Sequence, residues 1–142
     1  MVFDTNVLVS LYVFADSRFA PLRDKVEAGE WLALTGDACL DEFRRVLTYP
    51  MFALSADRQQ AAFAAYEQRV TRIPAPAGGT ACVELPRCKD RDDQKFLELA
   101  RDGAADWLVT ADKALLKLAR RERLRGLFRI MTPESALAEP GC

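Results

Sequence analysis

Three aspartates stand where an apolar segment or a loop gives way to a helical pattern. Asp4 follows the first apolar residues of the chain, and Asp112 follows the apolar segment 107–110. The carboxyl ends of parallel strands meet at one edge of a sheet, where α/β proteins bind their ligands. Asp93 ends the charged run 89–93 and opens a helical pattern. Because aspartate is also favourable at a helix N-terminus, capping is an alternative for each of the three taken alone.

Helical periodicity indicates where Asp93 points. At about 100° per residue, its side chain lies within roughly 40° of the centre of the apolar face predicted for helix 92–102. A carboxylate directed toward the interior needs a partner, because an unpaired buried charge is costly. Asp92 lies only slightly further from that face, so periodicity does not exclude it.

The predicted helix 38–48 brings a fourth acid. Its apolar stripe consists of Cys39, Leu40, Phe43, Val46 and Leu47. Glu42 borders this stripe, whereas Asp41 points to the opposite side and should be solvated. We therefore expect Glu42 at the rim of a cleft, with a glutamate that merely borders a core helix as the alternative.

These acids define the available chemistry, because the chain contains no histidine. Ser-His-Asp triads, Cys-His dyads and histidine-based RNA cleavage are excluded. Clustered carboxylates repel one another unless a cation lies among them, and oxygen ligands suit Mg²⁺ or Mn²⁺. Such ions lower the pKa of bound water and stabilise an in-line displacement at phosphorus. The sequence thus predicts a metal-dependent catalytic set, which consists of Asp4, Glu42, Asp93 and Asp112.

The elements that must position this set alternate between short apolar runs and helical patterns, which is typical of a parallel α/β sheet. The predicted strands are 2–3, 31–35, 70–73, 107–110 and 129–131. The predicted helices are 6–13, 18–28, 38–48, 57–69, 92–102 and 113–122, with a last helical turn that Thr132 caps and Pro133 begins. Segment 74–90, rich in proline and glycine, is a long irregular connection. We predict a single domain over 1–142.

Composition indicates a soluble globular protein, since the apolar fraction is 50% and the charged fraction 29%. We expect a cytoplasmic location without membrane association, because no signal peptide or membrane span is evident. The four cysteines form no C-x-x-C pair and are interpreted as reduced thiols. Trp31 and Trp107 are predicted to lie in the core.

Three motifs in order carry a family resemblance: Phe3-Asp4-Thr5-Asn6, Asp93-x-x-Phe96-Leu97-x-x-Ala100 and Val109-Thr110-x-Asp112. With an acid at Glu42, this set resembles the PIN domain family over nearly the whole chain. The longer segment 85–97 resembles the toxins of toxin–antitoxin systems, the VapC-like ribonucleases.

The resemblance implies a three-layer α/β/α sandwich around a mostly parallel sheet, and Mg²⁺- or Mn²⁺-dependent hydrolysis of RNA. It implies that Asp4, Glu42, Asp93 and Asp112 form the acidic quartet, and that Asn6 and Thr110 orient it. Asp90 is an additional acid in a supporting position. A cognate antitoxin protein and a homodimer are the further partners that the resemblance implies.

Overall charge does not indicate an RNA partner, because 20 basic and 21 acidic residues leave a net charge of −1. A local basic surface is predicted on helix 113–122, where Lys113, Lys117 and Arg120 lie opposite the face of Leu115, Leu116, Leu118 and Ala119. These side chains could contact phosphates, or they could form an ordinary solvated face.

Other enzyme classes fit less well. Aspartyl phosphatases need a second aspartate two residues after the first, and that position is Asn6. No glycine-rich dinucleotide or phosphate-binding motif follows a strand. The remaining alternative is a non-catalytic PIN-like module that binds RNA or a protein. A ribonuclease assay with and without a chelator separates it from the enzyme.

Overall fold

Five short parallel strands form the central sheet of the computed structural model, which describes residues 1–14, 17–74, 85–86, 88, 91–120 and 127–139. The strand order is β3-β2-β1-β4-β5, and every neighbouring pair is parallel. The strands are β1 (Val2–Phe3), β2 (Leu34–Thr35), β3 (Thr71–Arg72), β4 (Trp107–Val109) and β5 (Arg129–Met131). Parallel neighbours need crossover connections, which the helices between them supply.

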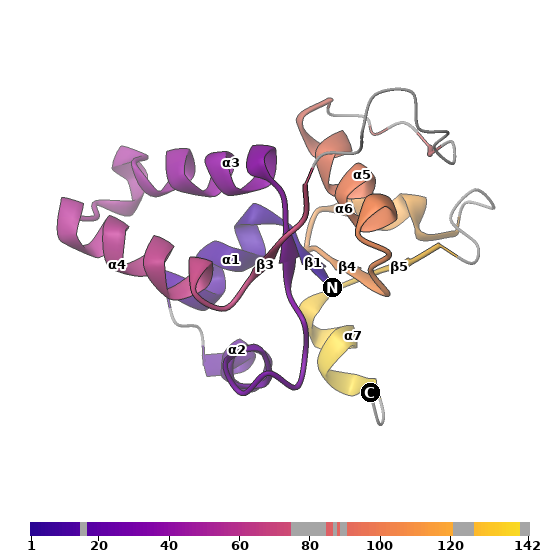
Figure 1. Cartoon of the computed structure of the whole chain (residues 1–142), viewed down its shortest axis with the longest axis horizontal. Coiled ribbons are helices and arrows are strands. Elements are labelled where there is room, and N and C mark those ends of the chain that lie inside the picture. Colours follow the sequence, from indigo (N-terminus) through magenta and orange to yellow (C-terminus); the bar gives the residue numbers. More distant parts are fainter. Residues whose placement is uncertain (15–16, 75–84, 87, 89–90, 121–126, 140–142) are drawn as a thin grey trace.

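Helices cover both faces of this sheet, as Figure 1 shows for α1, α3 and α4 on one side and for α5 and α6 on the other. The helices are α1 (Thr5–Tyr12), α2 (Ala20–Glu27), α3 (Asp37–Leu47), α4 (Ala56–Glu67), α5 (Gln94–Asp102), α6 (Lys113–Lys117) and α7 (Pro133–Ala138). Short 3₁₀ turns cover Ser17–Phe19, Pro50–Phe52, Arg91–Asp93 and Leu118–Arg120. The fold is the predicted α/β/α sandwich.

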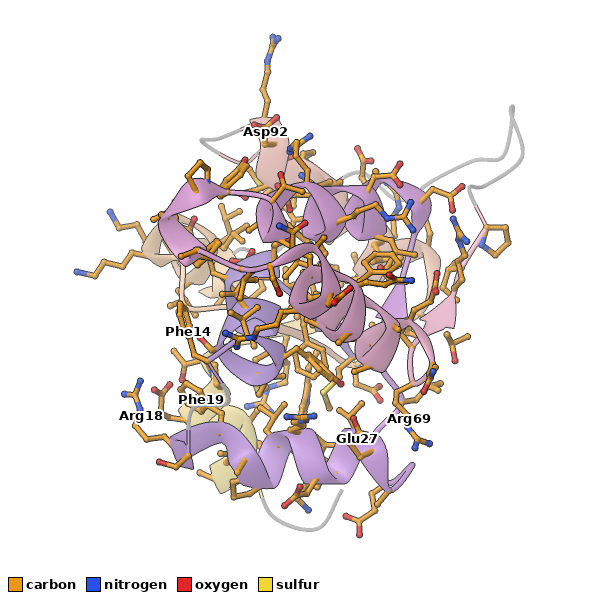
Figure 2. All side chains as sticks on the ribbon, turned by 90° about the vertical axis from the view of Figure 1, so that its left-hand side faces the viewer. Phe14, Arg18, Phe19, Glu27, Arg69 and Asp92 are labelled. Atoms are coloured by element: carbon orange, nitrogen blue, oxygen red, sulfur yellow. The ribbon has the colours of Figure 1, made fainter. Side chains whose placement is uncertain are left out.

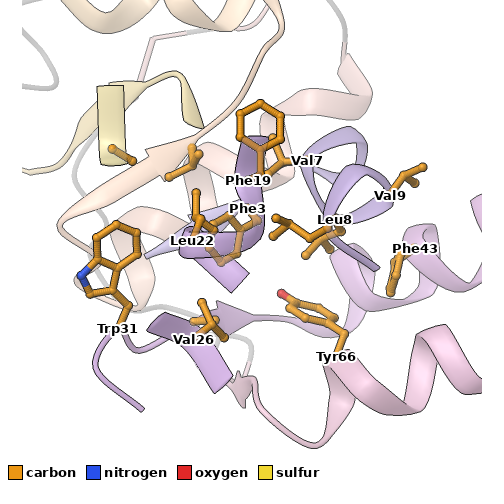
Figure 3. Packing of buried hydrophobic residues seen from close by; sticks show 14 of the residues in the cluster. Phe3, Val7, Leu8, Val9, Phe19, Leu22, Val26, Trp31, Phe43 and Tyr66 are labelled. Atoms are coloured by element: carbon orange, nitrogen blue, oxygen red, sulfur yellow. The ribbon is translucent and has the colours of Figure 1, made fainter. Parts of the chain in front are cut away.

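Side-chain alternation along the strands divides the apolar interior into two cores. Phe3 and Val109 point into a larger core with α1–α4 and α7, while Val2 and Leu108 point into a smaller one with α5 and α6. In the larger core Phe43 and Tyr66 meet edge-on, with ring centroids 5.5 Å apart (Figure 3). This packing holds α3 and α4 together, so it sets the position of Glu42 on α3.

Both tryptophans lie in the core, as predicted. Trp31 and Trp107 are buried and form a T-shaped pair with centroids 5.3 Å apart. At the surface, Arg69 after α4 is bound to Glu27 of α2 at 3.0 Å, and Figure 2 shows the two side chains facing one another. None of the helices in the described ranges has the length and apolar character that a membrane span requires.

Several predicted boundaries were wrong. The strand predicted over 31–35 is reduced to β2, because the N–H of Trp31 is bound to the carbonyl of Lys25 and Gly29 turns the chain with a φ of 77°. The predicted strand 70–73 is likewise limited to β3. The helix predicted over 113–122 ends at Lys117 and tightens into a 3₁₀ turn, a common helix ending. Ala119, assigned to its buried face, is exposed.

Candidate active site

Asp4 lies at the carboxyl edge of the sheet, beside the last residues of the neighbouring strand. The register that pairs Phe3 with Val109 brings Asp4 next to Thr110. The N–H of Asp4 donates to the carbonyl of Val109 at 3.0 Å, and the Thr110 hydroxyl donates to Oδ2 of Asp4 at 2.7 Å. Because the two strands are parallel neighbours, this contact follows directly from the sheet topology.

The Asp4 carboxylate is buried, with 5% of the residue exposed. Burial raises the pKa of Asp4 above its ordinary value, and the nearby carboxylates of Asp112 and Glu42 raise it further. The hydrogen bond from the Thr110 hydroxyl and the nearby backbone N–H of Asn6 oppose this rise in pKa. The Asn6 side chain itself is exposed. The carboxylates of Glu42 and Asp112 thus lie close enough to Asp4 to act on its charge.

Asp112 occupies the N-cap of α6, and its carboxylate accepts from the N–H groups of Ala114 at 2.7 Å and Leu115 at 3.4 Å. Its own N–H donates to the Thr110 hydroxyl at 3.0 Å, so one hydroxyl connects two acids. The capping alternative therefore describes Asp112 well. Asp4 is also at an N-cap position, on α1, but its side chain makes no capping hydrogen bond.

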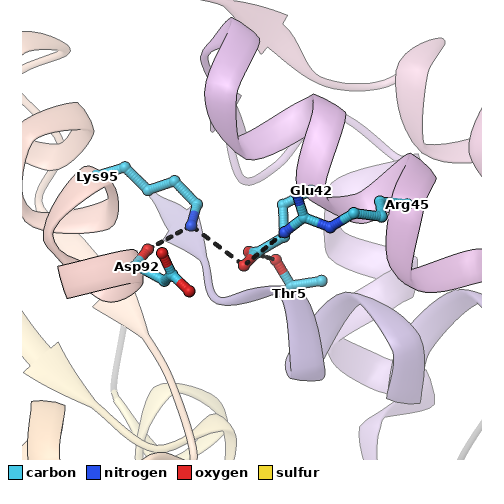
Figure 4. Close-up of polar contacts among 5 residues, drawn as sticks. All are labelled: Thr5, Glu42, Arg45, Asp92 and Lys95. Carbon is cyan, nitrogen blue, oxygen red and sulfur yellow. Dashed lines mark hydrogen bonds and ion pairs between the residues drawn. The ribbon is translucent and has the colours of Figure 1, made fainter. Parts of the chain in front are cut away.

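Glu42 faces the same edge from α3, and both of its oxygens are engaged (Figure 4). The hydroxyl of Thr5 donates to Oε2, and the ammonium of Lys95 donates to Oε1 at 3.1 Å. Arg45 stands 4.0 Å from Oε1, with 63% of its side chain exposed. Asp41 is exposed, as the helix periodicity predicts.

Asp93 is half-buried at the N-cap of α5, where its side chain makes no capping hydrogen bond. It ends the 3₁₀ turn Arg91–Asp93, so the predicted helix 92–102 is regular only from Gln94. Asp92 lies at the rim of the molecule and is exposed (Figure 2). Of the two aspartates that the helical pattern left open, Asp93 therefore lies nearer the interior. Asp90 lies outside the described residues.

Cys39 lies on α3, less than one turn before Glu42, and is buried. Burial raises the pKa of its thiol to about 12, although the nearby Lys95 ammonium partly opposes this. The group therefore stays a protonated thiol at neutral pH and is a poor nucleophile. Cys39 is a free thiol, in line with the reduced state expected from the sequence.

The donor set is chemically suited to a hard divalent cation, because it consists of carboxylate oxygens around the buried Asp4. In the described part of the chain, however, no three acidic or cysteine side chains converge closely enough to hold one ion. Two of the acids have partners within the protein: Asp112 accepts from the N-terminus of α6, and Glu42 accepts from Thr5 and Lys95.

The predicted basic surface is only partly described. Lys113 and Lys117 are exposed on α6, and Leu115 on the opposite face is buried. Arg120 ends the 3₁₀ turn Leu118–Arg120. Lys113 immediately follows the acid Asp112, so the positive charge begins next to the acidic edge.

Sequence reasoning missed three residues that shape the site: Thr5, Gln94 and Lys95. Thr5 directly follows Asp4, and its hydroxyl reaches α3. The Gln94 side chain accepts from the N–H of Cys88 at 2.7 Å and donates to the carbonyl of Pro86 at 3.1 Å. These two bonds connect Pro86 and Cys88 to the start of α5. The available signal in the sequence was that each of these polar residues lies close to a predicted acid. The contact of Lys95 with Glu42, however, arises only from the packing of α5 beside α3.

A parallel α/β/α fold with acids gathered at the carboxyl edge of the sheet defines a class of proteins that bind ligands at that edge. The family model described as "PIN domain" matches residues 1–114. The chain therefore belongs to the PIN domain family, whose fold is generally that of a nuclease. Among curated proteins none matches the chain.

Proposed function

We propose that this protein is a metal-dependent endoribonuclease that hydrolyses RNA phosphodiester bonds. The observation that carries the proposal is the buried carboxylate of Asp4 at the carboxyl edge, with Glu42 and Asp112 near enough to raise its pKa. A buried acid among other acids is costly unless a cation balances it. Together with membership of a family of nucleases, this favours phosphodiester hydrolysis over simple binding.

In this proposal Asp4, Glu42, Asp93 and Asp112 hold Mg²⁺ or Mn²⁺. The bound ion supplies a water of lowered pKa and balances charge on the reacting phosphate. The protein's own contribution is orientation. The Thr110 hydroxyl donates to Asp4 and accepts the backbone N–H of Asp112, so it fixes Asp4 and the start of α6. Thr5 fixes one oxygen of Glu42.

The same proposal includes a biological role as the toxin of a toxin–antitoxin pair, a cytoplasmic location, and partnership with a small antitoxin protein and a second copy of the chain. The family resemblance motivates these points. Expression of the chain alone should slow bacterial growth, and Asp93→Asn should relieve the effect. An active ribonuclease without any growth effect would favour a housekeeping nuclease.

One observation favours the non-catalytic alternative, a module that binds RNA or a protein. Lys95 already neutralises Glu42 without a metal, as expected of a site that keeps its acids but has lost its activity. Purified protein should be incubated with labelled RNA in Mn²⁺, in Mg²⁺ and in excess chelator, with Asp4→Asn as the matched control. Metal-dependent cleavage lost in Asp4→Asn supports the enzyme, whereas RNA binding without cleavage in any metal supports the module.

A further inference from the structure

The ammonium of Lys95 lies beside Glu42 and is held there by several contacts. It donates to Oε1 of Glu42 at 3.1 Å and to the backbone carbonyl of Asp92 (Figure 4). The side chains of Lys95 and Glu42 are 20% and 15% exposed. The ammonium also stands 5.0 Å from the ring centroid of Phe96. These contacts fix the position of the charge, in contrast to the ion pairs of exposed lysines.

This contact joins two helices that are far apart in sequence. Lys95 lies in the first turn of α5, and Glu42 lies in the middle of α3, 53 residues earlier. An ammonium beside a half-buried carboxylate offsets the cost of removing each charge from water. Lys95 thus gives Glu42 the positive partner that a divalent ion would otherwise supply.

We propose that Lys95 is an internal counter-ion that competes with the divalent metal for Glu42, so that metal binding displaces its ammonium. The inference rests on the metal use in the proposed function and adds a residue that sets metal affinity. Its geometric basis is the direct contact of the Lys95 ammonium with Oε1 of Glu42, a proposed metal ligand. One carboxylate oxygen cannot serve both cations fully, and two nearby positive charges repel.

The competition makes a prediction that a purely structural lysine does not. Loss of a structural contact would loosen the site and weaken metal binding, whereas loss of a competing cation tightens it. Mn²⁺ binding to chelator-treated protein should be measured by calorimetry for the wild type, Lys95→Met, Lys95→Gln and Lys95→Arg. We expect the two neutral variants to bind Mn²⁺ about tenfold more tightly. Lys95→Arg keeps the charge and should bind about as the wild type does.

Arg45 offers a matched control, because its guanidinium lies near the same oxygen but at 4.0 Å and largely exposed. Arg45→Met should change the Mn²⁺ affinity by less than about twofold, since solvent screens an exposed charge. Thermal unfolding in chelator supplies a second readout. The neutral Lys95 variants should melt below the wild type without metal and should gain more stability when Mn²⁺ is added.

Equal or weaker Mn²⁺ binding by folded Lys95→Met and Lys95→Gln overturns the inference but leaves the proposed function standing. If neither the wild type nor these variants bind Mn²⁺, both the inference and the metal use in the proposed function fail. Binding by the neutral variants alone supports the inference in its strongest form, in which Lys95 keeps the metal out.

Discussion

The hydroxyl of Thr110 donates to Oδ2 of Asp4 at 2.7 Å, and it joins two residues that lie 106 positions apart in the chain. The same hydroxyl accepts the N–H of Asp112 at 3.0 Å. Thr110 is fully buried, so water cannot replace either bond. One small side chain therefore sets the position of one acid and the helix start that carries another.

Replacement of Thr110 by valine keeps the shape and removes the hydroxyl. We expect a loss of about 1–3 kcal/mol in the free energy of unfolding, because a buried carboxylate loses its donor. Ribonuclease activity should fall about tenfold to hundredfold, as is usual when a residue that orients a site is lost. Chemical denaturation and RNA cleavage measure the two effects. Thr110→Ser restores the hydroxyl and should recover most of both, and failure of this rescue would contradict the role of the hydroxyl.

The pH dependence of stability should reveal the buried Asp4. Because the pKa of Asp4 is raised in the folded state above the ordinary value of 3.8, the folded protein binds this proton more tightly than the unfolded chain does. Its stabilising contribution is therefore full at low pH and is lost as the pH rises from the unfolded value through the raised folded pKa.

Asp4→Asn removes this titration. In chelator at neutral pH the variant should melt roughly a few degrees above the wild type, while it cleaves no RNA. The difference in melting temperature should shrink as the pH is lowered to about 4. A variant that is destabilised equally at both pH values would show that the Asp4 charge carries no such penalty.

Glu42 and Asp41 are adjacent acids on α3, and a comparison of the two tests whether Glu42 is the one that faces the candidate active site. Glu42 is half-buried and bonded to Thr5 and Lys95, whereas Asp41 is exposed. Glu42→Gln should lower the rate of RNA cleavage by about 100-fold or more, because a neutral amide cannot replace the carboxylate. Asp41→Asn should leave the rate nearly unchanged. Equal losses in the two variants would refute the placement of Glu42.

The basic surface formed by α6 and the 3₁₀ turn after it is predicted to guide RNA to the acids. Glutamine at Lys113, Lys117 and Arg120 should raise KM and flatten its salt dependence, by about 0.7 in the logarithmic slope for each lost phosphate contact. Mn²⁺ affinity should stay unchanged, since none of the three is a proposed ligand. An unaltered KM and salt slope would mean that RNA reaches the site by another route.

The positions of the acids could be predicted because they depend on local rules. Asp4 and Asp112 follow apolar strands, and the phase of α3 separates Glu42 from Asp41. What Glu42 contacts could not be predicted, because its partner Lys95 comes from the packing of α5 beside α3. The orientation of the Asp112 side chain could not be predicted from the sequence either, because a capping aspartate and a metal ligand would occupy the same position after a strand. Segment 31–35 was mistaken for a longer strand because a turn stabilised by Lys25 has no apolar periodicity of its own.

The most direct test of the central claim is the rate at which chelator-treated protein cleaves one labelled RNA as Mn²⁺ is titrated from zero to saturation. We predict no cleavage without the ion, a saturating rise whose midpoint agrees with the calorimetric affinity, and no cleavage at any concentration by folded Asp4→Asn. Cleavage that persists in chelator, cleavage by Asp4→Asn at the wild-type rate, or no cleavage by the folded wild type at saturating Mn²⁺ would contradict the account.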